Sequence, residues 1–429
     1  MELSSEQQNV IDKVLAGENV FMTGPGGTGK SYVIQKIVEM TNKYTKVCAM
    51  TGVAAELLKC SAKTIHSWSG MGRGTLDPER LLAKVMRNKQ ARNSIKKVEI
   101  LIVDEVSMMS VKFFQLLEFV LRRVRKSDHH FGGVTVLFSG DFYQLPPIGE
   151  KGSLENDNSR KFCFQCELWN KIFPVQNVIQ LTKFYRQKDP LFTKILMQIR
   201  KGVISRNTFQ ILSRKKEEFK HDPTTSPTII YPRRSLVNNE NKKHMDKLST
   251  KSHMYTSQVA YKEEFYLQKD LPQSLINNEI KRLQTEMNGE KELELKIGSH
   301  VMCIVNIESS LVNGSQGVVI DIIDDIPLVK FHNGITKSMD FHCWESDEIP
   351  GLCIKQIPLI LSWAITIHKS QGVTLDNAII DAGSTIFEYG QVYVAFSRVK
   401  TLDGILLKDF DPYSIKTNPS VKEFYKSLG

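Results

Sequence analysis

The segment Gly24 to Ser31, GPGGTGKS, limits the possible folds of this chain more than any other part of it. The apolar run Asn19 to Thr23 before it is typical of a buried strand, and Tyr32 to Met40 repeats apolar residues at helical spacing. A strand, a glycine-rich loop and a helix in this order hold nucleotide phosphates, because glycines let backbone N–H groups converge on phosphate oxygens. The lysine adds positive charge near the outer phosphates, and the serine hydroxyl can ligate magnesium. We therefore predict a nucleotide site made by Gly24, Gly26, Gly27, Thr28, Gly29, Lys30 and Ser31.

A chain of 429 residues, 41% of them hydrophobic, is long enough for two or three domains. It contains no apolar run of about 20 residues, the length that spans a bilayer. Residues 1–9 are too polar for a secretory signal, so we expect the chain inside a cell, an organelle or a viral factory and not in a membrane. Its formal charge of +10 fits a polyanionic partner, although many soluble proteins are merely basic.

The seven cysteines are odd in number and scattered, which favours reduced thiols over a disulfide framework. Cys163 and Cys166 have the spacing of metal ligands, but no second pair follows at a finger-like distance. A zinc site is therefore not favoured.

Short apolar runs of strand length recur after the glycine loop, at Val47 to Met50, Glu99 to Val103 and Val134 to Phe138. Between the last two, residues 113–124 form a helical apolar stripe. The basic residues 122–126 beside it are more simply a solvated face than a track for phosphates. Strands that alternate with helices predict a parallel α/β sheet.

A second series of strand-like runs indicates a second α/β domain. These runs are Thr228 to Tyr231, Leu359 to Thr366, Ala378 to Asp381 and Ile405 to Leu407. Between them lie alternating segments with Asn-Gly turn signals at 313–314 and 333–334, which predict a small β-rich insert.

Two carboxylates end the apolar run Leu101 to Glu105, LIVDE. Alone this is no more than a possible solvated strand end, but after a phosphate loop it indicates a site for phosphate-bound magnesium. We expect Asp104 to hold the metal, mostly through water, and Glu105 to orient and deprotonate the attacking water.

Another polar segment, Ser139 to Pro147, also follows a strand. Its Gln144 can both donate and accept hydrogen bonds, which suits a sensor of the third phosphate, although a simple turn residue is the alternative. Arg186 and Arg398 are candidates to neutralise the charge that develops in phosphoryl transfer. Since most arginines are surface cations, this role rests on their place in an ordered set.

The order of these segments resembles the PIF-one helicase family, a branch of superfamily one B, and its relative RecD. The likeness runs nearly end to end, through LSSEQ (3–7), TGVAA (51–55), TIHS (64–67), DEVSM (104–108), GDFYQLPP (140–147), LVNGS (311–315), SWAITIHKSQG (362–372) and YVAFSR (393–398). Three departures are Pro25-Gly26, where the family favours serine and alanine, Arg233, where threonine is common, and residues 254–294, which match little.

The resemblance implies an α/β fold of two RecA-like P-loop domains with parallel sheets and small inserted subdomains, one of them β-rich and barrel-like. We expect the first domain at residues 1–175, with an insert near 66–96, and the second at 176–429, with the β-rich insert near 245–355.

The implied activity is an ATP-dependent DNA helicase that moves 5′ to 3′ on single-stranded DNA and unwinds duplexes in replication, repair or recombination. ATP and Mg²⁺ are the implied cofactors. The implied partners are single-stranded DNA and 5′-tailed or forked duplexes. Neither the oligomeric state nor the compartment follows from the sequence, and a monomer is the expectation. Two alternatives stay open: an ATPase stimulated by single strands that remodels protein–DNA complexes without unwinding, and a nucleotide-switched binding module without turnover.

The resemblance also assigns residues that their chemistry alone does not. It places Gln7 on the adenine base and Gly372 near the third phosphate. It implicates Thr51, His66, His368 and Lys369 in holding DNA. Four aromatic residues, each otherwise a more ordinary core residue, are secondary candidates for stacking on bases: Trp68, Phe142, Tyr143 and Trp363.

Overall fold

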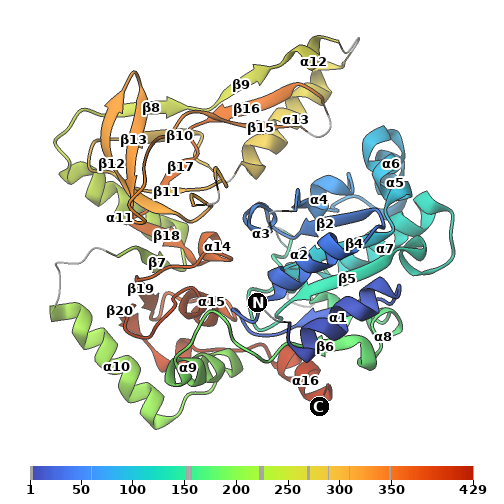
Figure 1. Cartoon of the computed structure of the whole chain (residues 1–429), viewed down its shortest axis with the longest axis horizontal. Coiled ribbons are helices and arrows are strands. Elements are labelled where there is room, and N and C mark those ends of the chain that lie inside the picture. Colours follow the sequence, from blue (N-terminus) through green and yellow to red (C-terminus); the bar gives the residue numbers. More distant parts are fainter. Residues whose placement is uncertain are drawn as a thin grey trace. The chain divides into compact units, whose positions relative to one another are not determined.

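The computed structural model describes residues 3–428 apart from 59, 151, 153, 155–156, 222–226, 268–270, 288, 309 and 347–348. The chain forms two compact units, Met1–Asp222 with Ile380–Gly429 and Pro223–Ile379 (Figure 1). The division lies within strand β19 (Ala378–Ala382). The domain limits expected at residues 175 and 176 stay a prediction.

A six-stranded sheet is the centre of the larger unit, with the strand order β3-β2-β4-β5-β1-β6. All its neighbouring strands are parallel. Its strands are β1 (Val20–Thr23), β2 (Thr45–Ala49), β3 (Lys63–Thr64), β4 (Ile100–Asp104), β5 (Thr135–Gly140) and β6 (Val178–Gln180). The glycine loop follows β1, and of the two predicted acids Asp104 ends β4 and Glu105 follows it, so the loop and the acids lie at the edge where the carboxyl ends of parallel strands meet.

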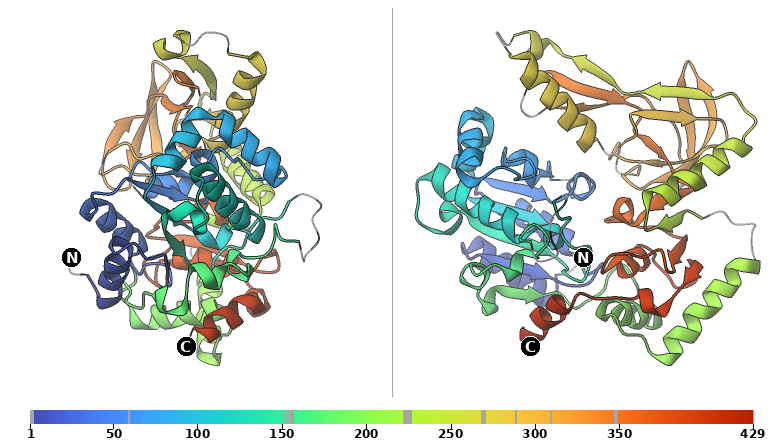
Figure 2. Two further views of the ribbon diagram at one scale, coloured as in Figure 1. Left: turned by 90° about the vertical axis from the view of Figure 1, so that its right-hand side faces the viewer. Right: turned by 180° about the vertical axis from the view of Figure 1, so that it is seen from behind.

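Twelve helices accompany this sheet in the described part of the larger unit. They are α1 (Ser5–Leu15), α2 (Lys30–Met40), α3 (Gly52–Leu57), α4 (Ile65–Trp68), α5 (Pro78–Arg87), α6 (Lys89–Lys97), α7 (Val111–Arg125), α8 (Trp169–Ile172), α9 (Pro190–Lys201), α10 (Arg206–His221), α15 (Gln391–Ser397) and α16 (Pro419–Ser427). The unit also contains strand β20 (Ile405–Phe410). The segment expected as an insert near 66–96 consists mainly of α5 and α6, which pack against α7 (Figure 2).

The two faces of the sheet are packed differently, as the alternation of side chains along β1 shows. Val20 and Met22 join an aliphatic core with residues of α1 and α2. Phe21 points to the other face, where its ring lies 5.1 Å from the rings of Phe142 and Trp169. Both layers exclude water from β1, which holds the start of the glycine loop in a fixed place.

The smaller unit is rich in antiparallel strands, as the alternation of its sequence predicts. Its sheets have the orders β14-β13-β12-β11-β17, β15-β16-β9 and β10-β8. The strands are β8 (His253–Thr256), β9 (Gln258–Tyr261), β10 (Glu292–Leu295), β11 (His300–Cys303), β12 (Gln316–Ile323), β13 (Ile326–Phe331), β14 (Thr336–Ser338), β15 (His342–Glu345), β16 (Leu352–Gln356) and β17 (Leu359–Leu361). The parallel pair β7 (Ile229–Tyr231) and β18 (Ala364–Thr366) belongs to the same unit, with helices α11 (Arg234–Lys247), α12 (Glu263–Tyr266), α13 (Gln273–Glu286) and α14 (Ile367–Ser370).

One expectation about this unit is wrong. The run Leu359 to Thr366 is not a single strand but two, which pair in different sheets. β17 pairs antiparallel with β11, whereas β18 pairs parallel with β7. A continuous apolar run predicts that a segment is buried, but it does not predict with which sheet the segment pairs. The hydrophobic pattern therefore does not indicate the break at Ser362-Trp363.

The α/β class with parallel sheets is confirmed. None of the helices in the described part of the chain has the length and apolar character of a membrane-spanning helix. Cys163 and Cys166 are free, buried thiols, and the Sγ of Cys163 lies 3.7 Å from the carbonyl oxygen of Val106.

The basic residues at the end of α7 are not all solvated. Arg125 donates from Nη1 to the carbonyl oxygens of Ile95, Lys96 and Val98, at 2.8–3.0 Å, and from Nε to that of Gly132 at 2.8 Å. It therefore satisfies carbonyls at the end of α6 that have no partner within the helix.

We expect Arg125→Ala to lower the free energy of unfolding by about 2 kcal/mol, because it removes charge-assisted hydrogen bonds to carbonyls. Arg123→Ala is the matched control, since Arg123 is 57% exposed and its acidic neighbour Glu79 lies 3.9 Å away. The control should change stability by less than about 0.5 kcal/mol. Urea unfolding of both variants measures the difference, and equal effects would contradict the capping role.

Candidate nucleotide and nucleic-acid sites

The glycine loop has a backbone that side chains rarely allow. Gly24, Gly27 and Gly29 have φ angles of 150°, 89° and 84°. A Cβ at Gly24 would lie 2.6 Å from the carbonyl oxygen of Leu181, and one at Gly29 would lie 2.8 Å from Nε2 of Gln7. Both the dihedral angles and the close neighbours therefore require glycine.

Lys30 begins α2 directly after the loop. Its Nζ donates to the carbonyl oxygens of Gly24 and Pro25 at 2.8 and 3.2 Å. Burial lowers the pKa of Lys30, while the charges of Asp141, Glu105 and Asp104 oppose that shift. No side chain caps the N-terminus of α2, so the N–H groups of its first turn point to the loop, as phosphate binding requires. The exposed Ser31 follows in the same turn.

The predicted acidic pair lies at the end of β4. Asp104 is 6% exposed, and its Oδ1 has no hydrogen-bond partner among the described residues. Burial raises the pKa of Asp104, and the charge of Lys30 opposes this. Glu105 has a φ of 56°, a left-handed conformation that is strained for a residue other than glycine and is often found at functional sites.

Gln144 is 3% exposed and belongs to the same unit. Its Oε1 also lacks a hydrogen-bond partner within the described structure. A buried acceptor without a donor is costly, so this side chain fits a site that a further group completes. Its role as a sensor stays a prediction.

Arg186 and Arg398 lie together beside the glycine loop. Nη1 of Arg186 donates to the carbonyl oxygen of Ser397 at 3.1 Å. A Cβ at Gly26 would lie 3.6 Å from Nη2 of Arg398, and one at Gly27 would lie 2.8 Å from Cβ of Arg186. The fold thus places both arginines beside the phosphate loop, where their predicted role requires them.

The electrostatics of the two arginines favour an anion. Arg398 is 2% exposed, and among the described residues it donates to neutral oxygens alone, those of Val394 and Ser397. Burial, followed by the charge of Arg186, lowers the pKa of Arg398 to about 10. Burial also lowers the pKa of Arg186. Neither arginine forms an ion pair with a carboxylate of the described residues, so a bound phosphate group would supply the missing negative charge.

Gln7 is buried beside the loop, and both ends of its amide are used. Its Oε1 accepts from the N–H of Ser4 at 3.0 Å and from the hydroxyl of Tyr185 at 3.4 Å. Its Nε2 donates to the carbonyl oxygen of Thr28 at 3.3 Å. The contact with adenine stays a prediction, and the structure adds that Gln7 ties α1 to the phosphate loop. Tyr185, whose backbone N–H donates to Gly27 at 2.8 Å, was not predicted.

Two predicted DNA-binding residues belong to the larger unit. Thr51 caps α3 by accepting from the N–H of Ala54 at 3.2 Å. The ring of His66 lies 4.7 Å from that of Phe113. Burial, with a smaller effect of Arg73, lowers the pKa of His66 to about 4, so the ring is neutral near pH 7 in the absence of DNA.

The other predicted residues for DNA and phosphate belong to the smaller unit. A cavity of about 990 Å³ is lined there by Lys369, Arg234, Lys242 and Asn238, among others. Nζ of Lys369 lies 3.4 Å from Oε1 of Glu290; burial lowers the pKa of Lys369 and Glu290 opposes this.

Two further residues of that unit were predicted to contact DNA or phosphate. His368 lies in α14 beside Lys369, and burial lowers its pKa. Gly372 has a φ of 81°. Their roles stay predictions.

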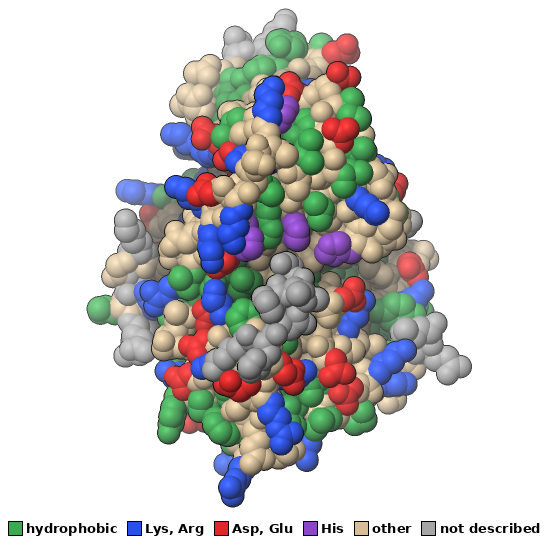
Figure 3. Space-filling model, turned by 90° about the vertical axis from the view of Figure 1, so that its left-hand side faces the viewer, with side chains coloured by type: hydrophobic (Ala, Val, Ile, Leu, Met, Phe, Trp, Pro, Cys, Tyr) green, Lys and Arg blue, Asp and Glu red, His purple; other side chains and the backbone are tan. Residues whose placement is uncertain are grey.

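The aromatic candidates do not offer open faces. Histidine side chains gather on the face that Figure 3 shows. The ring of Trp363 is stacked with those of His244 and His300, each 5.4 Å away. The ring of Tyr143 stacks on that of Tyr425 at 4.7 Å.

The other two candidates are buried as well. Phe142 is 1% exposed inside an aromatic cluster, and Trp68 is 6% exposed. Stacking of these four rings on bases is therefore not supported, because folding already covers them.

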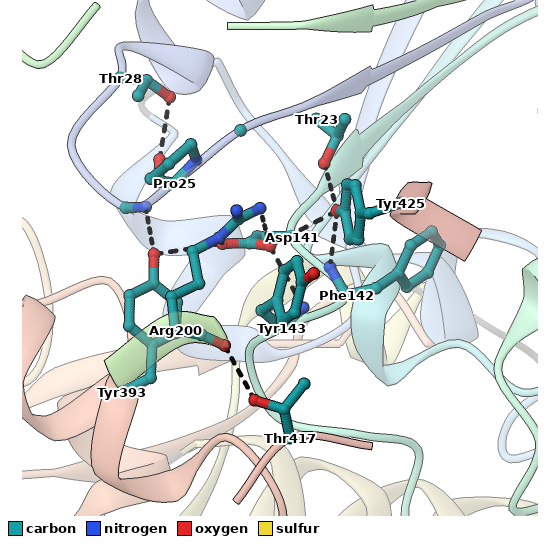
Figure 4. A network of polar contacts seen from close by, with 12 residues as sticks. Thr23, Pro25, Thr28, Asp141, Phe142, Tyr143, Arg200, Tyr393, Thr417 and Tyr425 are labelled. Atoms are coloured by element: carbon teal, nitrogen blue, oxygen red, sulfur yellow. Dashed lines mark hydrogen bonds and ion pairs between the residues drawn. The ribbon is translucent and has the colours of Figure 1, made fainter. Parts of the chain in front are cut away.

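Sequence reasoning missed a polar network centred on Asp141 (Figure 4). Asp141 follows the buried strand β5, and its carboxylate binds Arg200 of α9 and the hydroxyl of Tyr393 of α15. The available signal was an acid directly after an apolar strand, the same pattern that identified Asp104.

Comparisons with known proteins agree with this geometry. Residues 2–209 match the family model of the PIF1-like helicase, and residues 280–322 match that of the 2B domain of DNA helicase Pif1. The chain is 32% identical to the ATP-dependent DNA helicase Pif1 of Bdellovibrio bacteriovorus, covering 100% of this chain and 92% of that protein. The chain belongs to the PIF1-like helicase family.

Members from animals are longer. The chain is 35% identical to the ATP-dependent DNA helicase PIF1 of Xenopus laevis over its whole length, but it spans 65% of that protein. Among solved structures, the crystal structure of the Pif1 helicase from Candida albicans is 32% identical, with a TM-score of 0.83 and coverage of 100% of both chains. The resemblance seen in the sequence and the expected RecA-like fold class are thereby confirmed.

We expect Gly27→Ala to weaken ATP binding by about tenfold or more, since a shift of the loop and of Arg186 costs about 1–3 kcal/mol. The new Cβ would lie 2.7 Å from Oε1 of Gln187 and 2.8 Å from Cβ of Arg186. Gly334→Ala is the control, because Gly334 has a φ of 86° with no described atom within 4 Å of its Cβ position. Calorimetric titration with ATP measures both affinities, and an unchanged affinity in Gly27→Ala would contradict the assignment of the loop.

Proposed function

We propose that this chain is an ATP-dependent DNA helicase that moves 5′ to 3′ along single-stranded DNA and unwinds duplexes. The observation that carries the proposal is the pair of the buried Arg398 and the half-buried Arg186, which lie beside the glycine loop without an ion-pair partner among the described residues. A protein that only held a nucleotide would not need two further cations beside the loop that holds the outer phosphates. Its membership of the PIF1-like helicase family supports the same activity.

Each residue of the loop edge has a chemical task in this proposal. Lys30 and the N–H groups at the start of α2 hold the outer phosphates. Glu105 orients and deprotonates the attacking water, and Gln144 contacts the third phosphate. The two arginines neutralise the charge that grows on the phosphoryl oxygens in the transition state.

Magnesium fits the donor set of this edge. The unpaired, buried Oδ1 of Asp104 and the hydroxyl of Ser31 are hard oxygen ligands of the kind that this ion takes. We infer that these two residues hold Mg²⁺, directly or through water. When bound, the ion supplies positive charge to the phosphates of ATP.

DNA is the proposed polyanionic partner. Solved structures of a Bacteroides Pif1, 28–30% identical to this chain, include one bound to single-stranded DNA and one with ADP-AlF3 and single-stranded DNA. A further structure, 29% identical, concerns unwinding at forked duplex DNA by two coordinating Pif1 helicases. The cavity of the smaller unit has Lys369, Arg234 and Lys242 as cations for a phosphate backbone. Its lining also includes four acids, and one of them, Glu290, lies 3.4 Å from Lys369 and 3.2 Å from Arg234, so DNA would compete with this carboxylate for both cations. Affinity for DNA should fall steeply with salt.

The proposal includes work on DNA in replication, repair or recombination, inside a cell, an organelle or a viral factory. A monomer is the proposed working form. Preferences among forks, 5′-tailed duplexes and other DNA structures do not follow from the site.

Duplex unwinding with defined tails tests the proposal. We expect a 5′-tailed duplex to be separated and a 3′-tailed duplex to stay intact. Lys30→Ala and Glu105→Gln should each reduce unwinding and DNA-stimulated hydrolysis by about 100-fold or more. Lys36→Ala and Glu39→Gln are matched controls on α2, where the two residues form an exposed ion pair. Unwinding only from 3′ tails would contradict the polarity. Displacement of a bound protein without strand separation would favour the remodelling ATPase instead.

A second experiment separates the functional arginine from a structural one. We expect Arg398→Met to reduce hydrolysis by about 1,000-fold or more without lowering the thermal midpoint measured without nucleotide. Its guanidinium is buried and forms no ion pair in the described part of the chain, so an apolar side chain of similar length relieves a desolvation cost.

Arg200→Met is the contrasting variant, because it leaves the buried carboxylate of Asp141 without its ion-pair partner. It should lower the free energy of unfolding by about 3–5 kcal/mol. Differential scanning fluorimetry and an ATPase assay measure both effects. A loss of stability in Arg398→Met as large as that in Arg200→Met would contradict the assignment.

A further inference from the structure

The phosphate loop is connected to a buried carboxylate that makes no direct contact with it. Asp141 is 0% exposed and accepts five hydrogen bonds in the described structure. Arg200 supplies two of them, from Nε at 2.9 Å and from Nη2 at 2.8 Å. Burial lowers the pKa of Arg200, but the charge and hydrogen bonds of Asp141 outweigh it and raise the pKa above its ordinary value. The pair is therefore a fixed anchor for neighbouring groups.

Tyr393 links this anchor to the loop. Its hydroxyl donates to Oδ2 of Asp141 at 3.2 Å and accepts from the backbone N–H of Gly26 at 2.9 Å. Burial raises the pKa of Tyr393, which keeps the hydroxyl protonated and able to donate. Figure 4 shows the contact of the Tyr393 hydroxyl with Asp141. Tyr393 lies on α15, the helix whose C-cap is Arg398.

Tyr425 of α16 reaches the same anchor from another side. Its hydroxyl donates to Oδ1 of Asp141 at 3.4 Å and accepts from the backbone N–H of Phe142 at 3.2 Å. Because its single proton is used, Oγ1 of Thr23 is the donor in their contact of 2.5 Å. Thr23 ends β1 and Phe142 lies two residues before Gln144, so Tyr425 joins the start of the loop to the segment of the proposed sensor.

We propose that Tyr393 is a positioning residue for ATP hydrolysis, because its hydroxyl fixes the phosphate loop relative to Asp141 and to helix α15. Three parts of the site then keep one geometry: the loop at Gly26, the segment of Gln144 and the helix that ends at Arg398. Tyr425 is a second positioning residue of the same assembly, acting on the ends of β1 and β5. The inference rests on the proposed function, since hydrolysis must occur for the positioning to matter.

This role predicts a specific kinetic pattern. Binding of ATP in the ground state depends on the loop amides and Lys30, which Tyr393 does not replace. The transition state also needs Arg398 and Gln144 in place, and a misplacement of about 1 Å can cost about 100-fold in rate. Removal of the hydroxyl should therefore lower kcat more than it raises KM.

Tyr393→Phe tests the inference, because it removes one oxygen and keeps the ring. We expect kcat for DNA-stimulated ATP hydrolysis to fall by about 10- to 100-fold, with KM changed by less than about twofold. Tyr413→Phe is the matched control, since Tyr413 is 83% exposed, and it should behave as the unmodified protein. Tyr425→Phe should lower kcat in the same way by a smaller factor. It also provides the test should Tyr393→Phe fail to give folded protein by circular dichroism.

A double-variant cycle separates positioning from general destabilisation. If Tyr393 acts by placing Arg398, then Tyr393→Phe combined with Arg398→Met should be no slower than Arg398→Met alone. Fully additive losses, an unchanged kcat in Tyr393→Phe, or a raised KM with an unchanged kcat would each overturn the inference. If neither the unmodified protein nor the Tyr413→Phe variant hydrolyses ATP, the proposed function is overturned instead. Hydrolysis without strand separation would overturn only the helicase part and leave the comparison of the tyrosine variants valid.

Discussion

The parallel register of β1, β4 and β5 is the constraint on which the rest of the site depends. Thr23 lies beside Gly140 and Val103 beside Phe138 in the sheet, so all three strands end at one edge. The first loop glycine follows β1, Asp104 is the last residue of β4, and Asp141 follows β5. The aliphatic layer on one face and the aromatic layer on the other hold the strands in this register. Functional residues that are more than 100 positions apart in the sequence thereby lie at the same edge of the sheet.

The charges at this edge divide into satisfied and unsatisfied ones, and this division separates structural from functional groups. Arg200 and Arg398 are both 2% exposed. Arg200 forms an ion pair with Asp141, which raises its pKa. Arg398 forms no ion pair in the described structure, and burial and the charge of Arg186 lower its pKa to about 10, although the charge of Glu105 opposes this. Since burial is the same, the difference lies in the partner. The fold itself provides Arg200 with an anionic partner, Asp141. The ion-pair partner of Arg398 would be a bound ligand.

The sequence determined the local elements well and the distant pairings poorly. Periodicity and one motif predict the strand before the glycine loop, the acids at the end of β4, and helices α2 and α7, because each of these depends on neighbours in the chain. The split of residues 359–366 between two sheets depends on partners elsewhere. The Asp141–Arg200 pair joins residues 59 positions apart, and Arg125 caps carbonyls from 27 to 30 positions away. Residue type gives no signal for such contacts, so Arg125 resembles a solvated cation until the structure places it.

The neighbours Phe424 and Tyr425 show how apolar packing directs the polar network. Phe424 stacks on Phe164, with ring centroids 4.4 Å apart, and meets Phe142 edge-on at 5.4 Å. Tyr425, the next residue on α16, turns its hydroxyl to Asp141. Phe142 belongs to both environments, since its ring lies in the aromatic cluster while its N–H donates to Tyr425. Burial of the rings supplies the free energy that holds α16 in place, but dispersion and the hydrophobic effect have little directionality.

The hydroxyls of Tyr393 and Tyr425 determine the orientation of the groups they bind, since a hydrogen bond fixes both distance and angle. Packing therefore stabilises the assembly, and the two hydroxyl groups determine its geometry at the phosphate loop.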